Sequence, residues 1–189
     1  MQDLKEKCRL ALVQASPVMF DKTASLNRAL EWIDKAAEQG AELVVFPELF
    51  LPGYPFGMTF GFKVGSRDEE GRKDWKLYYD NSVVCPGPET EALGAAAKKY
   101  HIYLSIGVSE RDDTTGTLYN TNIMFTADGV LASVHRKLKP TGAERFVWGD
   151  ANRGYFPTVE SQWGPLGSLI CWENYMPLAR AALYQRGVN

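Results

Sequence analysis

The stretch "GSLICWENYMPLAR" (residues 167–180) places a thiol where a predicted strand gives way to a helix. Apolar and small residues lead up to Cys171, and Pro177 suits the first position of the helix that follows. Backbone N–H groups near a helix start favour a thiolate and can receive developing negative charge. A free cysteine is by default a small buried apolar residue, but this context favours a nucleophile at Cys171.

Strands and helices are predicted to alternate over the first half of the chain. The runs "CRLALVQ" (8–14) and "ELVVF" (42–46) are typical of buried strands. The segment between them has the apolar spacing of a helix, with Thr23 as its N-cap and Gly40 at its end. A strand, a helix and a second strand predict a parallel pair joined by a crossover.

The middle of the chain adds a helix (88–101), a strand (102–109) and a hairpin. The hairpin is indicated by Asp128-Gly129 between two apolar segments, and "PLGSLIC" (165–171) is expected to be the final strand. The whole predicts a layered α/β domain that mixes parallel and antiparallel strands. Residues 53–82 form a long excursion of the kind that is often functional.

Composition excludes several classes of protein. A chain of 189 residues with 45% hydrophobic and 23% charged residues is typical of one globular domain with a sizeable core. The net charge of −2 predicts neither a nucleic-acid nor a membrane partner. No run is long enough to span a bilayer. The three cysteines are odd in number and far apart, which argues against a disulfide framework and favours a cytoplasmic location.

Two further motifs place charged side chains at or beyond the ends of strands. In "FPELFLPGYP", Glu48 follows a strand at the carboxyl edge, where open α/β sheets bind ligands. In "VHRKLKPTGAER", alternation puts His135, Lys137 and Lys139 on one face. Taken alone, Glu48 reads as a loop carboxylate in water and the basic run as an edge that deters strand pairing. Glu144 is equally ordinary in isolation.

A thiol nucleophile needs a base to take its proton and a donor to stabilise the intermediate. The residues leave two assignments open. His135 could pair with Cys171, since spacing alone does not exclude it. In the alternative, a partly buried carboxylate is the base and Lys137 stabilises the negative charge.

The segments "FPELFLPGYP", "HRKLKPT" and "GSLICWENYMPLAR" together resemble the carbon–nitrogen hydrolase superfamily, and specifically its nitrilase branch. They occur in the family's order and are reinforced by "VCPGPET" and "AERFVWGD". The resemblance implies a four-layer α-β-β-α sandwich. Because family members continue well beyond the helix after the cysteine, we expect residues 1–189 to be a single domain that lacks the family's C-terminal part.

The resemblance also implies a role for each site residue. In its Glu–Lys–Cys triad, Glu48 matches the general base, Lys137 the catalytic lysine and Cys171 the nucleophile. Glu144 matches a second glutamate that holds the lysine. Tyr54 and Trp172 of the same motifs are expected to contact the substrate. No metal or organic cofactor is implied, and the sequence shows no paired Cys/His ligand spacing and no phosphate-binding loop.

The activity implied is hydrolysis of an organic nitrile to its carboxylic acid and ammonia, through a covalent cysteine thioimidate and an acyl-enzyme. An amide, cyanide or carbamoyl substrate is the alternative within the superfamily. Members often form dimers, spirals or filaments, so a homo-oligomer is expected, and a catalytically silent fragment that self-associates is the alternative of another class. Five aromatic residues could line a pocket for the nitrile, although core packing is the default for each of them: Phe56, Phe60, Trp75, Trp148 and Trp172.

Overall fold

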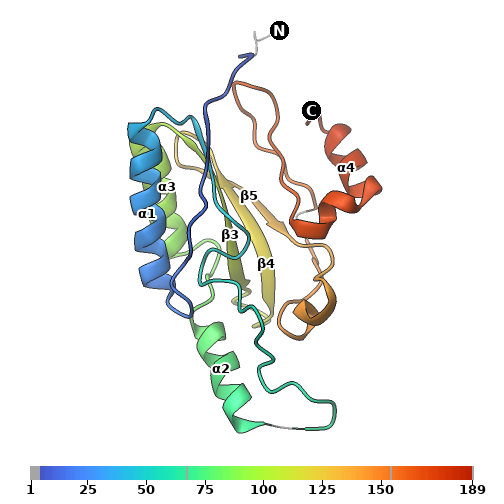
Figure 1. Ribbon diagram of the computed structural model, residues 1–189. Coiled ribbons are helices and arrows are strands. Elements are labelled where there is room, and N and C mark those ends of the chain that lie inside the picture. The colour runs from blue at the N-terminus through green and yellow to red at the C-terminus, as the bar shows by residue number, and fades with distance from the viewer. Residues whose placement is uncertain (1–4, 67, 154, 189) are drawn as a thin grey trace.

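The computed structural model describes residues 5–66, 68–153 and 155–188, and a mixed five-stranded sheet stands at its centre (Figure 1). The strands are β1 (Leu10–Leu12), β2 (Leu43–Val45), β3 (Tyr103–Arg111), β4 (Leu118–Phe125) and β5 (Leu131–Arg136), in that spatial order. The first three strands run parallel, and β4 and β5 pair antiparallel. The mixed sheet and the hairpin predicted from the sequence are confirmed.

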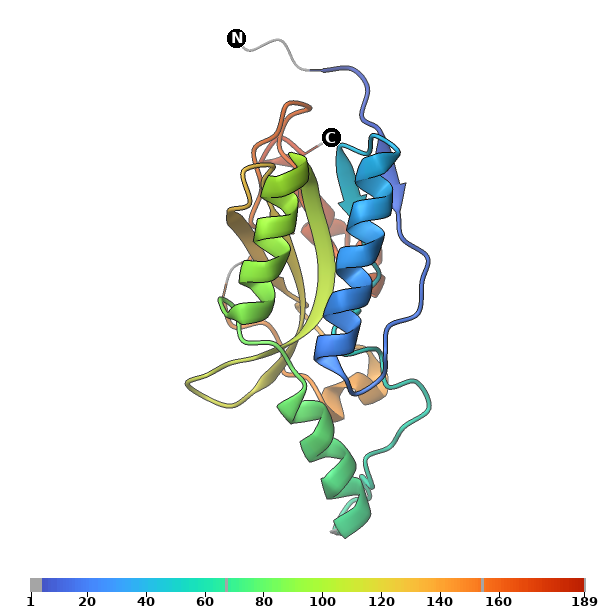
Figure 2. The ribbon, with the colours of Figure 1, turned by 90° about the vertical axis from the view of Figure 1, so that its left-hand side faces the viewer.

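Two helices cover one face of this sheet. Helices α1 (Lys22–Glu38) and α3 (Pro88–Tyr100) lie side by side there, as both views show (Figures 1 and 2). Helix α1 begins one residue before the predicted cap, because the side chain of Asp21 accepts a hydrogen bond from Ala24 N at 2.8 Å. The apolar core forms between the helices and the sheet, where Ile33 and Leu93 are fully buried.

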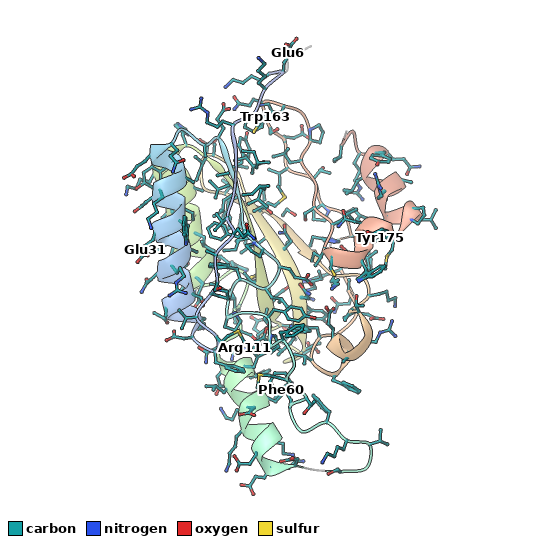
Figure 3. The ribbon with its side chains drawn as sticks, viewed as in Figure 1. Glu6, Glu31, Phe60, Arg111, Trp163 and Tyr175 are labelled. Atoms are coloured by element: carbon teal, nitrogen blue, oxygen red, sulfur yellow. The ribbon has the colours of Figure 1, made fainter. Side chains whose placement is uncertain are left out.

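A helix that the sequence did not predict lies within the long excursion. Helix α2 (Glu69–Asp80) extends from the end of the sheet, and Phe60 lies beside it (Figure 3). Most of its side chains are charged and exposed, so it lacks the apolar stripe that predicts a helix. A second small core forms near it, and its buried members are Leu49, Phe60, Tyr78, Leu118 and Trp148.

Two strand predictions need correction. The first strand was expected to be buried, yet β1 lies at the sheet edge and leaves Leu10 and Leu12 exposed by 48% and 72%. The final strand, 165–171, is extended backbone that makes one isolated bridge, between Val159 and Leu166. A strand is defined by pairing with a neighbour, and no named strand of the described residues pairs with this segment.

The C-terminal part of the chain lies on the face of the sheet opposite to α1 and α3 (Figure 1). It comprises the extended segment, a 3₁₀ turn at Cys171–Tyr175 (η2) and helix α4 (Pro177–Tyr184). Another 3₁₀ turn, η1 (Gly142–Phe146), follows β5. Within the described ranges, no helix is long and apolar enough to cross a membrane.

Candidate active site

The face of the sheet turned toward the C-terminal segment is polar. Side chains alternate along each strand, so the residues between the apolar core positions of β3, β4 and β5 point to this side. The polar residues of this face are Ser105, Ser109, Asn120, Asn122, Ser133 and His135, and Lys137 continues the row just past β5. Buried polar groups need partners, and carboxylates from three loops supply them for Asn120, His135 and Lys137.

Gly107 of β3 allows the loop that carries Glu48 to lie directly on the sheet. Gly107 N donates to Pro47 O at 3.2 Å, and Leu51 N donates to Gly107 O at 3.3 Å. A Cβ atom on Gly107 would stand 2.7 Å from Glu48 Cα and 2.4 Å from Leu49 N. Such distances are too short for a side chain, so the absence of one at position 107 sets the position of Glu48.

Lys137 joins two carboxylates at the centre of the site. Its side chain is fully buried, and Nζ donates to Glu48 Oε1 at 2.9 Å and to Glu144 Oε2 at 2.8 Å. Burial acts to lower the pKa of Lys137, but the hydrogen bonds to Glu144 and Glu48 outweigh it and raise that pKa above its ordinary value. Lys137 is therefore a fixed cation at neutral pH.

Glu144 is held on both of its oxygens. Oε2 accepts from Lys137 and also from Thr141 N at 2.8 Å, at the start of η1. Oε1 accepts from the Tyr54 hydroxyl at 2.8 Å. Burial, reinforced by the hydrogen bond to Glu144, raises the pKa of Tyr54, so this phenol stays a donor. Glu144 is thus a fixed second carboxylate partner of Lys137.

Cys171 occupies the turn between the extended segment and η2. Its backbone is left-handed, with φ of 54°, a conformation that is rare for residues other than glycine and recurs at active sites. Cys171 lines a cavity of about 360 Å³ between the sheet and segment 166–170, and Glu48 and Asn120 line the same cavity. The predicted tight turn is present, although a 3₁₀ turn precedes the helix.

Glu173 is a buried site residue that sequence reasoning did not single out. Its carboxylate is fully buried and accepts from Ile170 N at 2.7 Å, from Leu138 N at 2.6 Å and from His135 Nε2 at 2.8 Å. It thereby connects the residue before Cys171 to the residue after Lys137. The signal in the sequence is an acidic residue two positions after a predicted nucleophile.

The contact with Glu173 also bears on the Cys–His alternative. His135 Nε2 is bonded to Glu173, and Nδ1 is buried with no hydrogen-bond partner among the described residues. The ring stacks on Phe156, with the centroids 5.6 Å apart. Neither ring nitrogen is bonded to the Cys171 thiol, so the geometry favours a carboxylate over His135 as the base.

The aromatic residues considered for the pocket lie elsewhere. Trp172 is 58% exposed and contacts Tyr175, with the ring planes tilted by 40° and the centroids 4.9 Å apart. It is not among the residues that line the cavity. Figure 3 shows Tyr175 on the C-terminal side of the molecule, away from α1. Phe60 and Trp148 belong to the second core, Trp75 stacks on Tyr79, and Phe56 is 91% exposed. Tyr54 is the predicted binding residue that joins the charged cluster.

Comparison with known sequences places the chain among hydrolases of C–N bonds. A profile of the carbon–nitrogen hydrolase family matches residues 9–189. An aliphatic nitrilase of Sinorhizobium fredii (strain HH103) is 48% identical over 182 residues, which cover 96% of this chain and 58% of that protein. Nitrilase 2 of Arabidopsis thaliana is 45% identical over 181 residues, which cover 96% of this chain and 53% of that protein. The chain therefore spans about half the length of the curated relatives it matches.

Comparison with solved structures gives the same fold. The structure of Saccharomyces cerevisiae Nit3, a member of branch 10 of the nitrilase superfamily, superposes with a TM-score of 0.77 at 26% identity. The match covers 100% of this chain and 64% of that one. An amidase from Nesterenkonia sp. superposes with a TM-score of 0.68 at 18% identity, over 98% of this chain and 64% of that one. The α/β nitrilase fold predicted from the sequence is confirmed.

Proposed function

The chain belongs to the carbon–nitrogen hydrolase family, and from this premise we propose that it hydrolyses an organic nitrile to the corresponding carboxylic acid and ammonia. One observation carries the proposal: buried Lys137 lies 2.9 Å from Glu48 and 2.8 Å from Glu144, while Glu48 and Cys171 line one cavity. The nitrilases among the relatives support the nitrile as substrate. Residues 1–189 are proposed to act as one domain.

The proposed reaction begins at the thiol. Glu48 accepts the proton of Cys171, and Sγ attacks the nitrile carbon. The nitrile nitrogen takes up a proton, which gives a thioimidate. Water adds to its carbon, ammonia leaves, and an acyl-enzyme remains. A second water releases the carboxylic acid and returns the thiol to Cys171, so that one nitrile and two waters yield one acid and one ammonia.

Lys137 is proposed to stabilise the negative charge that develops as water adds to the thioimidate and to the acyl-enzyme. The N–H of Trp172, adjacent to the nucleophile, is proposed as a second donor. Preorganised donors of this kind are each worth about 3 kcal/mol in enzymes where they have been removed. Glu144 is proposed to hold the ammonium group of Lys137 in place, because it bonds that group and is itself held by Tyr54 and Thr141.

Ammonia release from a panel of nitriles tests the proposal. We expect turnover by the chain and its loss in Cys171→Ala. Cys8→Ala is the matched control, since Cys8 is also a free, exposed thiol but lies outside the cavity. Full activity in Cys171→Ala would show that the mechanism is wrong. Faster hydrolysis of the matching amides or carbamoyl compounds, or of cyanide, would assign one of the alternative substrates.

The exposed aromatic and aliphatic residues near the nucleophile favour self-association. Trp172, Tyr175, Leu178 and Tyr184 of η2 and α4 are each more than half exposed, and apolar surface of this kind is typical of interfaces. We therefore propose a homo-oligomer, with the catalytically silent self-associating fragment as its alternative. Light scattering measures the assembly, and a chain that associates but releases no ammonia would select the fragment.

A cytoplasmic location is also part of the proposal. All three cysteines are free, which suits a reducing compartment. Fractionation of cells that produce the chain tests this location directly.

A further inference from the structure

We propose that Asn120 is a positioning residue that fixes the carboxylate of Glu48, so that Glu48 Oε2 is the atom that accepts the proton of the Cys171 thiol. This inference rests on the proposed function and deepens it, because it assigns the base atom and the residue that selects it. Asn120 is the third residue of β4, lies on the polar face and is 1% exposed.

Asn120 contacts both charged partners in the site. Its side-chain Nδ2 donates to Glu48 Oε1 at 2.5 Å. Its main-chain carbonyl oxygen accepts a hydrogen bond from Lys137 N at 2.7 Å. One residue of a central strand therefore fixes the backbone that carries Lys137 and the carboxylate that Lys137 binds.

The two oxygens of Glu48 have different surroundings. Oε1 accepts two hydrogen bonds, from Lys137 Nζ at 2.9 Å and from Asn120 Nδ2 at 2.5 Å. Within the described ranges no hydrogen bond reaches Oε2, and the Glu48 side chain keeps 24% of its exposure in the wall of the cavity that Cys171 also lines. Since two donors engage the lone pairs of Oε1, Oε2 is the oxygen that is free to take a proton.

The hydrogen bond from Asn120 restricts the Glu48 carboxylate to one orientation. The terminal torsion of a glutamate is broad, so a carboxylate held by Lys137 alone can exchange its two oxygens on the ammonium group. Asn120 Nδ2 binds the oxygen that Lys137 already holds, and it does so from a strand rather than from a loop. The plane of the carboxylate is then fixed, and the orientation of Oε2 is fixed with it.

The amide oxygen of Asn120 shows that packing alone does not explain why position 120 is an asparagine. Oδ1 is buried and has no hydrogen-bond partner among the described residues. Buried polar atoms are nearly always paired, and an unpaired one destabilises the folded state. Leucine has a similar shape and carries no such penalty. The donor to Glu48 is therefore the reason for an amide at this position.

Alkylation of Cys171 by iodoacetamide tests the inference without requiring nitrile turnover. The sulfur–carbon bond forms, iodide leaves, and the thiol proton passes to Glu48. The Cys8→Ser background leaves Cys171 as the one exposed thiol of the described residues, because Cys85 is partly buried. In this background, Asn120→Leu and Asn120→Asp are compared with Asn122→Leu. Asn122 lies on the same face of β4 but donates to Ser105 Oγ at 3.0 Å instead of to Glu48.

We expect Asn120→Leu to unfold at or above the parental temperature, yet to alkylate Cys171 at least about tenfold more slowly, since a positioned base contributes about 10²-fold or more. Asn120→Asp keeps the shape but replaces the donor by an acceptor, so it should show the same loss and serves if the leucine variant does not fold. For nitrile hydrolysis, kcat should fall with KM nearly unchanged. Asn122→Leu should alkylate much faster than either Asn120 variant, because Asn122 lines the same cavity but bonds Ser105 and not Glu48.

Parental alkylation rates in both Asn120 variants would overturn the inference and leave the proposed function intact. Equal losses of alkylation and of thermal stability in the Asn120 and Asn122 variants would assign Asn120 a structural role and would also overturn it. If the parental Cys171 reacts no faster than Cys8 does in a Cys171→Ser protein, the proposed function itself fails, and the assignment of a base atom fails with it.

Discussion

Arg136 and Lys137 are consecutive buried cations on opposite faces of the sheet, and each is paired with two carboxylates. Arg136 donates through Nε to Glu110 at 2.8 Å and through Nη2 to Glu110 and to Asp112, the latter at 3.0 Å. Lys137 bonds Glu48 and Glu144 at similar distances. Neither cation has exposed side-chain surface. Burial and ion pairing are thus the same in the two clusters and do not identify the site.

The difference lies in what remains unbonded. In the Arg136 cluster, the guanidinium group also stacks 3.8 Å from the Tyr119 ring centroid, and Glu110 Oε2 takes a further bond from Thr121 at 2.7 Å. Both oxygens of Glu110 are engaged, and its side chain is 1% exposed. In the Lys137 cluster, Glu48 keeps one oxygen free at a cavity shared with a thiol. A buried ionic cluster is a candidate for chemistry when it leaves a reactive atom accessible.

Replacing Lys137 by methionine should give the largest effect. The change removes the cation proposed to stabilise the developing negative charge, and loss of such a donor lowers kcat by about 10³-fold. Stability should fall less than in an Arg136 variant, because Glu48 opens to the cavity and Glu144 keeps its hydrogen bonds from Tyr54 and Thr141. Ammonia release and urea unfolding measure the two quantities. Turnover at the level of the parent would show that Lys137 resembles Arg136 in being purely structural.

Replacing Arg136 by methionine should give the converse result. Among the described residues, buried Glu110 would lose its two bonds from Arg136 and keep, as a cationic partner, only the mostly exposed Arg153 at 3.4 Å. Breaking a buried pair in this way costs about 3–5 kcal/mol of unfolding free energy. Turnover per folded molecule should be retained, since Arg136 points away from the cavity. Urea unfolding, combined with active-site titration of Cys171, separates the two effects. A specific loss of kcat in the folded protein would contradict the division between the clusters.

Alkaline pH should weaken the Lys137 cluster, with a smaller effect than either substitution. The pKa of Lys137 is raised by its carboxylates, against the effect of burial, and the pKa of Tyr54 is raised by burial and by Glu144. The folded chain therefore holds both protons more tightly than the unfolded chain does. Their contribution to stability is complete below about pH 10 and declines as the pH rises above it. The unfolding free energy, measured as a function of pH, should fall in this range.

The Tyr54→Phe variant sharpens this measurement. It removes one of the titrating groups, so stability should decline less steeply above about pH 10. At lower pH the variant should lose about 1 kcal/mol, the usual net value of a hydrogen bond. Tyr155→Phe is the control, because Tyr155 is exposed and lies outside the cluster. If the unfolding free energy of Tyr54→Phe declined with pH as steeply as that of the parent, Tyr54 would not contribute to the loss of stability at alkaline pH.

The sequence was sufficient for those elements whose signal is local. Helix α3 and the hairpin around Asp128-Gly129 have periodicity and turn residues within a few positions of each other, and both are present. Helix α2 was missed because only Gly71 and Tyr78 are buried on it. The exposure of β1 was missed because it depends on β1 lying at the edge of the sheet, which local pattern does not specify.

The site residues likewise fall into those with a local sequence signal and those without one. Glu48, Lys137 and Cys171 stand in motifs long enough to be recognised, and the structure brings Glu48 into contact with Lys137 and into one cavity with Cys171. Asn120 and Glu173 were not found. Asn120 meets Glu48 across 72 residues of sequence, and Glu173 meets Leu138 across 35. Such contacts depend on strand register and on the path of two loops, and no spacing rule relates the partners.

The lack of a side chain at Gly107 has a consequence for how the chain tolerates mutation. Even one added methyl group at this position would meet backbone atoms of the Glu48 loop at 2.4–2.7 Å. Displacing a reactive group by about 1 Å can lower a rate by about 10²-fold. In a saturation screen scored on turnover, position 107 should therefore accept no other amino acid, although glycine carries no functional group.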